Sequence, residues 1–101
     1  MIPLFIISLT YVASLERCDE LIPEHAAFLD RYYADGTFLV SGRKVPRTGG
    51  VILARGGSRE EILKIIENDP FRREGVAEYD VIEFAATRTS GALEEYREEL
   101  P

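Results

Sequence analysis

Hydrophobic residues follow a strand-like pattern at the start of the chain and then a helical one. Residues 2–11, IPLFIISLTY, carry apolar side chains on both alternating faces, which is typical of a strand covered on two sides. From Ser14 apolar residues recur at helical spacing, until Asp35 and Gly36 supply a glycine stop. Pro23 lies inside this segment, and we expect it to bend or restart the helix.

The rest of the chain predicts three more strands and a second helix. Ser58 and Glu61 form a capping box, which opens a helix with an apolar stripe of isoleucine and leucine. Gly49 and Gly50 end a short loop, so the strands on either side of that loop should be antiparallel. The further predicted segments are strands at 37–44, 51–56 and 76–87, the loop at 45–50, and an acidic, partly helical segment at 90–99.

The order β-α-β-β-α-β is that of the α+β ferredoxin-like fold, in which both helices cover one face of a four-stranded antiparallel sheet. A chain of 101 residues has the size of one domain, so we expect a single domain over residues 1–101. The first strand is apolar on both faces, and an uncovered apolar sheet face is costly. We therefore expect a homodimer that pairs through the free sheet face.

Charge and cysteine content narrow the classes of partner. Eighteen acidic and twelve basic residues give a net charge of -6, which disfavours nucleic acid because phosphate backbones would be repelled. No segment has the length and apolarity expected of a membrane span, and the apolar start lacks the features of a signal peptide. Cys18 is the single cysteine, and its helical apolar setting indicates a packed thiol in a reducing, cytoplasmic environment.

Two residues could carry acid-base chemistry, and each also has a structural explanation. His25, the only histidine, falls on the apolar side of the first predicted helix, where it could simply pack or could act as a general acid or base. Asp69 precedes Pro70 in the stretch ENDPF, an arrangement typical of a helix N-cap. The two roles of Asp69 are compatible, since one carboxylate oxygen can accept the backbone N–H of a cap while the other oxygen faces the His25 imidazole.

A cluster of cations surrounds the predicted hairpin. Arg43, Lys44 and Arg47 could be solvated surface charges or could form an anion pocket, since a guanidinium binds a carboxylate with two hydrogen bonds. Neither a dinucleotide fingerprint nor a phosphate-binding loop occurs. One histidine and one cysteine do not supply a metal-ligand set, and no G-x-S-x-G element occurs. We therefore expect neither a metal nor a cofactor.

Three motifs resemble the YCII-related (YciI-like) family of small bacterial proteins. They are HAAFL after the helix-one histidine, FLVSG leading to PRTGGVIL, and the DPF turn before AEYDVIEF. The resemblance implies a ferredoxin-like protomer that pairs into a dimeric α/β-barrel, with a cleft around His25 and Asp69. It also places Ser41 and Gly42 at the small residues that end the second strand. Many relatives have proline where this chain has Arg43, so the charge of the pocket differs from theirs.

Two hypotheses about function follow. The first is a cofactor-independent enzyme that acts by proton transfer on a small, anionic organic molecule, with His25 as acid or base, Asp69 as its orienting partner and Arg43 or Arg47 as carboxylate anchor. Lyase, isomerase and hydrolase chemistry are all consistent with it. The second is a non-catalytic dimeric module that binds a small ligand or assists another protein, with His25 and Asp69 serving packing and capping.

Overall fold

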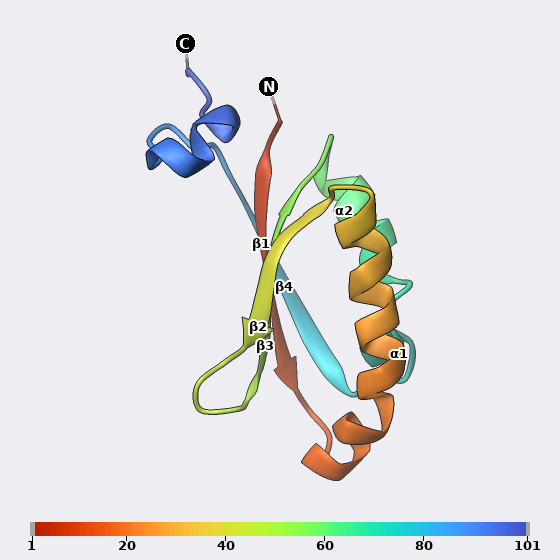
Figure 1. Ribbon diagram of the computed structural model, residues 1–101. Helices are drawn as coiled ribbons and strands as arrows, with labels where there is room; N and C mark the ends of the chain where they lie inside the picture. The colour runs from red at the N-terminus through yellow and green to blue at the C-terminus, as the bar shows by residue number, and fades with distance from the viewer. Residues whose placement is uncertain (1, 101) are drawn as a thin grey trace.

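A computed structural model describes residues 2–100, and in it a four-stranded antiparallel sheet carries the α-helices on one face (Figure 1). The strand order is β2-β3-β1-β4, so β1 lies in the middle and pairs with both β3 and β4. The elements are β1 (Leu4–Tyr11), α1 (Leu15–Ala34), β2 (Phe38–Arg43), β3 (Gly49–Arg55), α2 (Arg59–Ile66), α3 (Pro70–Arg73), β4 (Ala77–Phe84) and the 3-10 helix η1 (Gly91–Tyr96). This arrangement confirms the predicted α+β ferredoxin-like fold.

Both long helices begin at the serines that the sequence indicated. The Ser14 hydroxyl accepts from the Arg17 backbone N–H at 3.1 Å, and the Ser58 hydroxyl accepts from the Glu61 N–H at 3.2 Å. α1 ends where Gly36 adopts a φ of 83°, a conformation that glycine reaches without strain. α1 runs through Pro23 without restarting, and its first turns are inclined to the remainder of the helix (Figure 1).

All four strands differ from the prediction by one to three residues at one or both ends. β3 begins at Gly49 and not at residue 51, because Gly49 and Gly50 pair with Thr10 and Leu9 of β1 instead of closing a loop. A Cβ atom on Gly49 would lie 1.9 Å from the carbonyl oxygen of Leu9, so these glycines permit close approach of two backbones. β4 ends at Phe84, three residues before the predicted end at residue 87.

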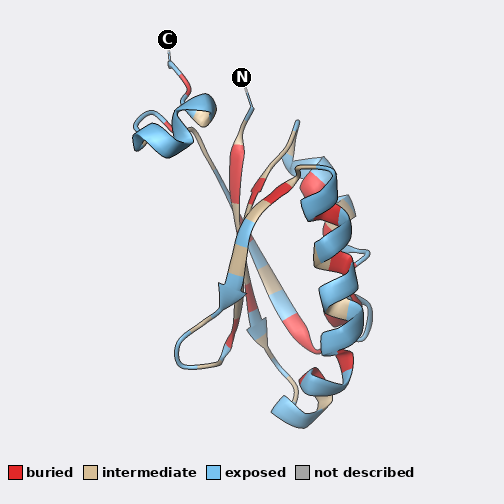
Figure 2. Ribbon diagram, in the orientation of Figure 1, coloured by how far each residue is buried: buried red, intermediate tan, exposed pale blue. Residues whose placement is uncertain are grey.

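The core lies between the sheet and the helices. Phe5, Ile7 and Leu9 belong to the core cluster and are almost completely buried, and buried positions occur both on α1 and on the strands that it covers (Figure 2). Aromatic residues of α1 and β2 pack together there, with the Phe28 and Phe38 ring centroids 5.6 Å apart. A polar side chain on the helix-facing side of a strand is therefore buried, and it needs a hydrogen-bond partner within the protein.

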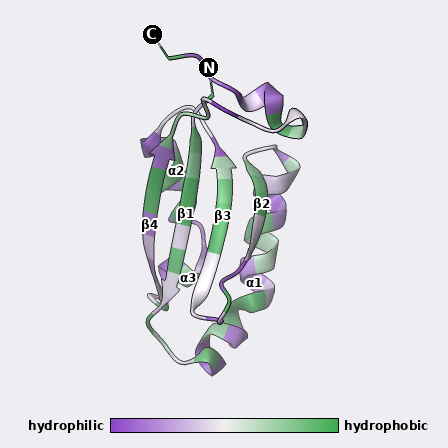
Figure 3. Ribbon diagram, turned by 90° about the vertical axis from the view of Figure 1, so that its left-hand side faces the viewer, coloured by the Kyte–Doolittle hydropathy of each residue, from purple (hydrophilic) through white to green (hydrophobic). Residues whose placement is uncertain are grey.

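The opposite face of the sheet carries apolar side chains that the protomer leaves exposed. Val40, Val51 and Ile82 are 57%, 38% and 49% exposed. Figure 3 views the sheet from its helix-free side, and hydrophobic residues occur in every strand. The C-terminal segment with η1 lies on the same side of the sheet, at one end (Figure 1). Within residues 2–100, no helix combines the length and the apolar character that crossing a membrane requires.

Candidate active site

Asp69 lies in the tight connection between α2 and α3, where the local sequence dictates its conformation. The residue before a proline favours extended backbone, and Asp69 has φ -74° and ψ 125°. Pro70 then begins α3, and the Asp69 Oδ1 atom accepts a hydrogen bond from the Phe71 N–H at 3.0 Å. Asp69 therefore has the capping role that its position indicated, yet its side chain is completely buried, which a surface cap does not require.

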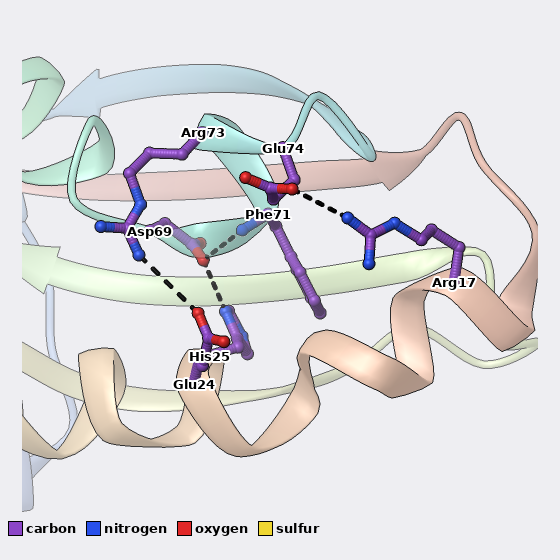
Figure 4. Close-up of polar contacts among 7 residues, drawn as sticks. All are labelled: Arg17, Glu24, His25, Asp69, Phe71, Arg73 and Glu74. Carbon is purple, nitrogen blue, oxygen red and sulfur yellow. Dashed lines mark hydrogen bonds and ion pairs between the residues drawn. The ribbon is translucent and has the colours of Figure 1, made fainter.

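His25 reaches the same carboxylate from α1. Its Nδ1 atom lies 2.9 Å from Asp69 Oδ1, across 44 residues of chain (Figure 4). Its ring stacks on Phe71, with centroids 4.2 Å apart and planes 8° apart. The hydrogen-bonding contact with Asp69 therefore fixes the edge of the imidazole, and the stacking on Phe71 fixes its face.

The second ring nitrogen of His25, Nε2, has a different environment. Within residues 2–100 no protein group hydrogen-bonds to it, and no buried side-chain nitrogen or oxygen lacks a partner. Nε2 is therefore accessible, although the side chain as a whole is only 14% exposed. The His25 side chain also lines a cavity, and Nε2 is its one ring nitrogen that has no hydrogen-bond partner within residues 2–100.

Tyr79 completes the group and was missed in the sequence analysis. Its hydroxyl donates to Asp69 Oδ2 from β4, the edge strand beside β1. Burial raises the pKa of the Tyr79 phenol well above its usual value, and the nearby negative charge of Asp69 raises it further. One signal could have revealed it: alternation places Tyr79 on the same face as Ala77 and Val81, and an inward-facing phenol needs a hydrogen-bond partner.

The cavity beside His25 has a volume of about 230 Å³. It lies between α1, the ends of β2 and β3, and Phe71 of α3, and its walls are mainly apolar. The predicted site residues His25, Ser41, Gly42, Arg43 and Arg47 all line it. Asp69 does not line it but lies behind the imidazole. The other residues around it are Leu9, Tyr11, Ile22, Ala26, Leu29, Gly49, Gly50, Val51, Ile52 and Phe71.

The two arginines of the cavity differ in their partners. Arg47 forms an ion pair with Asp19 of α1 and lies 5.7 Å from the centre of the Tyr11 ring. The hydrogen bond to Asp19 raises the pKa of the Arg47 guanidinium. Arg43 is exposed and has no carboxylate partner within residues 2–100. The structure thus distinguishes two cations that the sequence left equivalent, since within residues 2–100 Arg47 has a carboxylate partner and Arg43 has none.

Ion pairs join α1 to α3 and its C-cap on either side of the His25–Asp69 contact. Arg17 pairs with Glu74 at 2.8 Å, and Arg73 approaches Glu24 at 3.9 Å (Figure 4). All four side chains are substantially exposed, so each pair contributes only about 0–1 kcal/mol. The two pairs flank the contact between the imidazole and the carboxylate.

The donor set around the cavity does not form a metal centre. In the part of the chain that is described, no three histidine, cysteine or carboxylate side chains gather in one place. Cys18 is buried in α1, and burial raises the pKa of its thiol. The polar groups that line the cavity include the His25 imidazole, the Arg43 and Arg47 guanidinium groups, the Tyr11 hydroxyl and the Ser41 hydroxyl, which is hydrogen-bonded to Tyr33.

Fold and site together define a small ferredoxin-like protein in which a histidine lines an apolar cavity. The buried Asp69 carboxylate contacts this histidine, and the Arg43 guanidinium borders the same cavity. The chain belongs to the YCII-related domain family, whose model matches residues 4–85. This match confirms the resemblance found in the sequence.

Among solved structures, the chain is similar to 5-chloro-2-hydroxyhydroquinone dehydrochlorinase (TftG) from Burkholderia phenoliruptrix AC1100, in complex with 2,5-dihydroxybenzoquinone. The TM-score is 0.71 at 24% identity, over 80% of this chain and 92% of that one. At 24% identity, the similarity between the two structures shows a shared fold and nothing further. The comparison with curated proteins finds no significant match.

Proposed function

We propose that this protein is a cofactor-independent enzyme that transfers a proton to or from a small, anionic organic molecule. The observation that carries the proposal is the placement of His25, with Nδ1 against the buried Asp69 carboxylate and Nε2 accessible at the cavity. An imidazole held this way suits general acid-base catalysis, because one nitrogen is fixed while the other exchanges protons.

The direction of the first proton transfer follows from hydrogen-bond chemistry. An ionised carboxylate only accepts hydrogen bonds, so the Nδ1 atom that faces Asp69 carries the proton. The neutral ring then presents the Nε2 lone pair to the cavity and acts as the base. When Nε2 takes a proton, the imidazolium forms beside the Asp69 carboxylate, which stabilises it. Elimination, isomerisation and hydrolysis can each proceed from that step.

Charge and size indicate the kind of molecule. Arg43 supplies a guanidinium that has no carboxylate partner among residues 2–100, and a carboxylate or phenolate of a ligand would suit it. The cavity of about 230 Å³ is smaller than the roughly 300–1,000 Å³ of typical ligand pockets, so the molecule is small, and apolar walls favour a largely hydrocarbon body. The TftG structure supports this choice, because that protein is named for the loss of hydrogen chloride from a chlorinated hydroxyhydroquinone.

We also propose that the protein forms a homodimer through the helix-free face of the sheet. The exposed Val40, Val51 and Ile82 support this arrangement, together with the partly exposed Ile6 and Leu53 between them. A second copy is a suitable cover, since a two-fold axis pairs one apolar face with an identical one. This pairing would produce the dimeric α/β-barrel that the family resemblance implies.

The experiment that tests the enzymatic proposal uses His25 as a probe. Small aromatic and aliphatic carboxylates and phenols are screened by NMR for shifts of the His25 imidazole signals, and those that bind are incubated with protein in deuterium oxide. We expect at least one ligand with an exchangeable C–H to incorporate deuterium, and His25→Ala to slow this by about 100-fold or more.

The results of this screen separate the enzymatic hypothesis from the ligand-binding one and can also contradict both. Binding without deuterium incorporation, or incorporation that His25→Ala leaves unchanged, would contradict catalysis and favour the ligand-binding module. Absence of binding across the whole panel would contradict both the substrate class and the use of the cavity.

A further inference from the structure

We infer that Tyr79 is a positioning residue of this site, which holds the Asp69 carboxylate so that His25 keeps its proton on Nδ1 and its lone pair on Nε2. The consequence for catalysis rests on the proposed function. The structural claim about the Asp69 and His25 side chains does not.

The two oxygens of Asp69 have separate tasks. Oδ1 accepts from the Phe71 N–H and lies against His25 Nδ1, whereas Oδ2 has one partner within residues 2–100, the Tyr79 hydroxyl. Removing that hydroxyl leaves Oδ2 without a donor in a side chain that has no exposed surface. A carboxylate in that state gains by rotating toward another donor, and rotation disturbs the bond from Oδ1 to His25.

Tyr79 is well placed to act as a fixed support. It lies on β4 opposite Leu9 of β1, the central strand, and a site held by sheet residues is more rigid than one held by loops. Its raised pKa keeps the phenol protonated, so it stays a donor through the pH range in which histidine titrates. A rotation of the Asp69 carboxylate would therefore break its hydrogen bond to the Tyr79 hydroxyl.

The test compares Tyr79→Phe with a matched hydroxyl deletion elsewhere. Tyr32→Phe is the control, because the buried Tyr32 also loses a hydroxyl that accepts from a neighbour, Asn68 Nδ2 at 3.0 Å, and has no hydrogen bond to Asp69 within residues 2–100. Because His25 is the only histidine, its ring nitrogen signals are unambiguous in ¹⁵N-edited NMR. We expect wild type and Tyr32→Phe to show a neutral ring protonated at Nδ1, with a downfield, slowly exchanging Nδ1 proton.

In Tyr79→Phe we expect a mixture of the two neutral tautomers and faster exchange of the Nδ1 proton, by about tenfold or more. Ligand-induced shifts should appear at the same ligand concentration as in wild type, because Tyr79 does not line the cavity. Deuterium incorporation into a ligand should slow by about tenfold at saturation. A Tyr79→Phe protein with the wild-type tautomer and wild-type proton exchange would overturn the inference.

Two further results keep this inference separate from the proposed function. If no ligand incorporates deuterium but the tautomer responds to Tyr79→Phe, the positioning role stands and the enzymatic proposal fails. If Tyr79→Phe does not fold, the wild-type protein decides: a Tyr79 phenol that ionises at the pH of a free phenol contradicts a hydroxyl held on Asp69, and one that stays protonated there supports it.

Discussion

The imidazole of His25 and the ring of Phe71 lie face to face, with centroids 4.2 Å apart and planes 8° apart. Phe71 thus acts twice, since its N–H binds Asp69 Oδ1 and its ring supports the imidazole bonded to the same oxygen. The motif Asp69-Pro70-Phe71 is therefore both a helix start and one wall of the site. Its role as a cap and its proposed role in catalysis depend on the same geometry.

Asp69 should contribute more stability than an ordinary cap. Asp69→Ala leaves the Tyr79 hydroxyl, the Phe71 N–H and the His25 Nδ1 without their shared acceptor, and we expect a loss of about 3 kcal/mol in the free energy of unfolding. Asp69→Asn keeps an acceptor for Phe71 and should lose about 1 kcal/mol. Urea denaturation measures both.

The control for Asp69 is Asp35→Asn, because Asp35 Oδ1 also accepts a backbone N–H, that of Thr37, at 2.9 Å, in an exposed turn. This change should cost less than about 0.5 kcal/mol. If Asp69→Ala is no more destabilising than the Asp35 control, the buried carboxylate does not bind the Tyr79 hydroxyl, the Phe71 N–H and the His25 imidazole together.

Arg43 and Arg47 should respond differently to anionic ligands. Arg43→Gln removes the free guanidinium, and we expect the affinity for a small carboxylate such as benzoate to fall about tenfold and to lose most of its salt dependence. Arg47→Gln removes a cation already paired with Asp19 and should change affinity less. NMR titration at low and high salt measures both, and the reverse order would assign the anchor to Arg47.

Gly49 should tolerate no side chain. A Cβ atom there would lie 1.9 Å from the Leu9 carbonyl oxygen, so Gly49→Ala must push β3 away from β1, at an expected cost above about 3 kcal/mol. Gly91→Ala is the control, because a Cβ on Gly91 meets nothing within 4 Å. Thermal unfolding should show a large drop for the first variant and almost none for the second. Equal melting temperatures would contradict the strand register.

Stability should fall on the alkaline side because two buried acids have raised pKa values. Burial raises the pKa of Cys18 from its ordinary value of 9.0, and burial and Asp69 raise that of Tyr79 from 10.0. Above these ordinary values the unfolded chain loses protons that the folded chain retains, so the free energy of unfolding decreases as pH rises. Below them this contribution is fully present.

Urea denaturation between pH 8 and 11 checks this decline. Cys18→Ala and Tyr79→Phe should each flatten part of the curve, because each removes one of the two groups. A stability that stays constant or increases over this range in the wild-type protein would contradict the burial of these groups.

The proposed dimer should depend on the helix-free face. Ile82→Glu places a charge at the exposed centre of β4 and should convert a dimer into a monomer, measured by light scattering after size-exclusion chromatography. Leu63→Glu is the control, because Leu63 is similarly exposed, at 43% against 49%, but lies on α2 in the other layer. A wild-type monomer, or a dimer that only Leu63→Glu disrupts, would contradict pairing through the sheet.

Local chemistry in the sequence determined the order of the elements and most helix boundaries. Serine caps, a glycine stop and an Asp-Pro turn act within a few residues of each other, so their effects can be predicted without knowing the fold. The same is true of the apolar faces of β1, and hence of the expectation that the sheet needs a cover. The roles of Gly49 and Gly50 were misassigned, because the close approach of Leu9 comes from a strand about 40 residues away.

Only the tertiary structure decided which chemical groups meet. The sequence offered His25 and Asp69 as candidates, but the contact between them spans 44 residues and depends on how α3 packs against α1. Tyr79 also contacts the Asp69 carboxylate, because strand pairing brings this position of β4 close to it. Arg47 differs from Arg43 because Arg47 forms an ion pair with Asp19 of α1. Such contacts depend on distances through space, which a pattern of residue types along the chain does not contain.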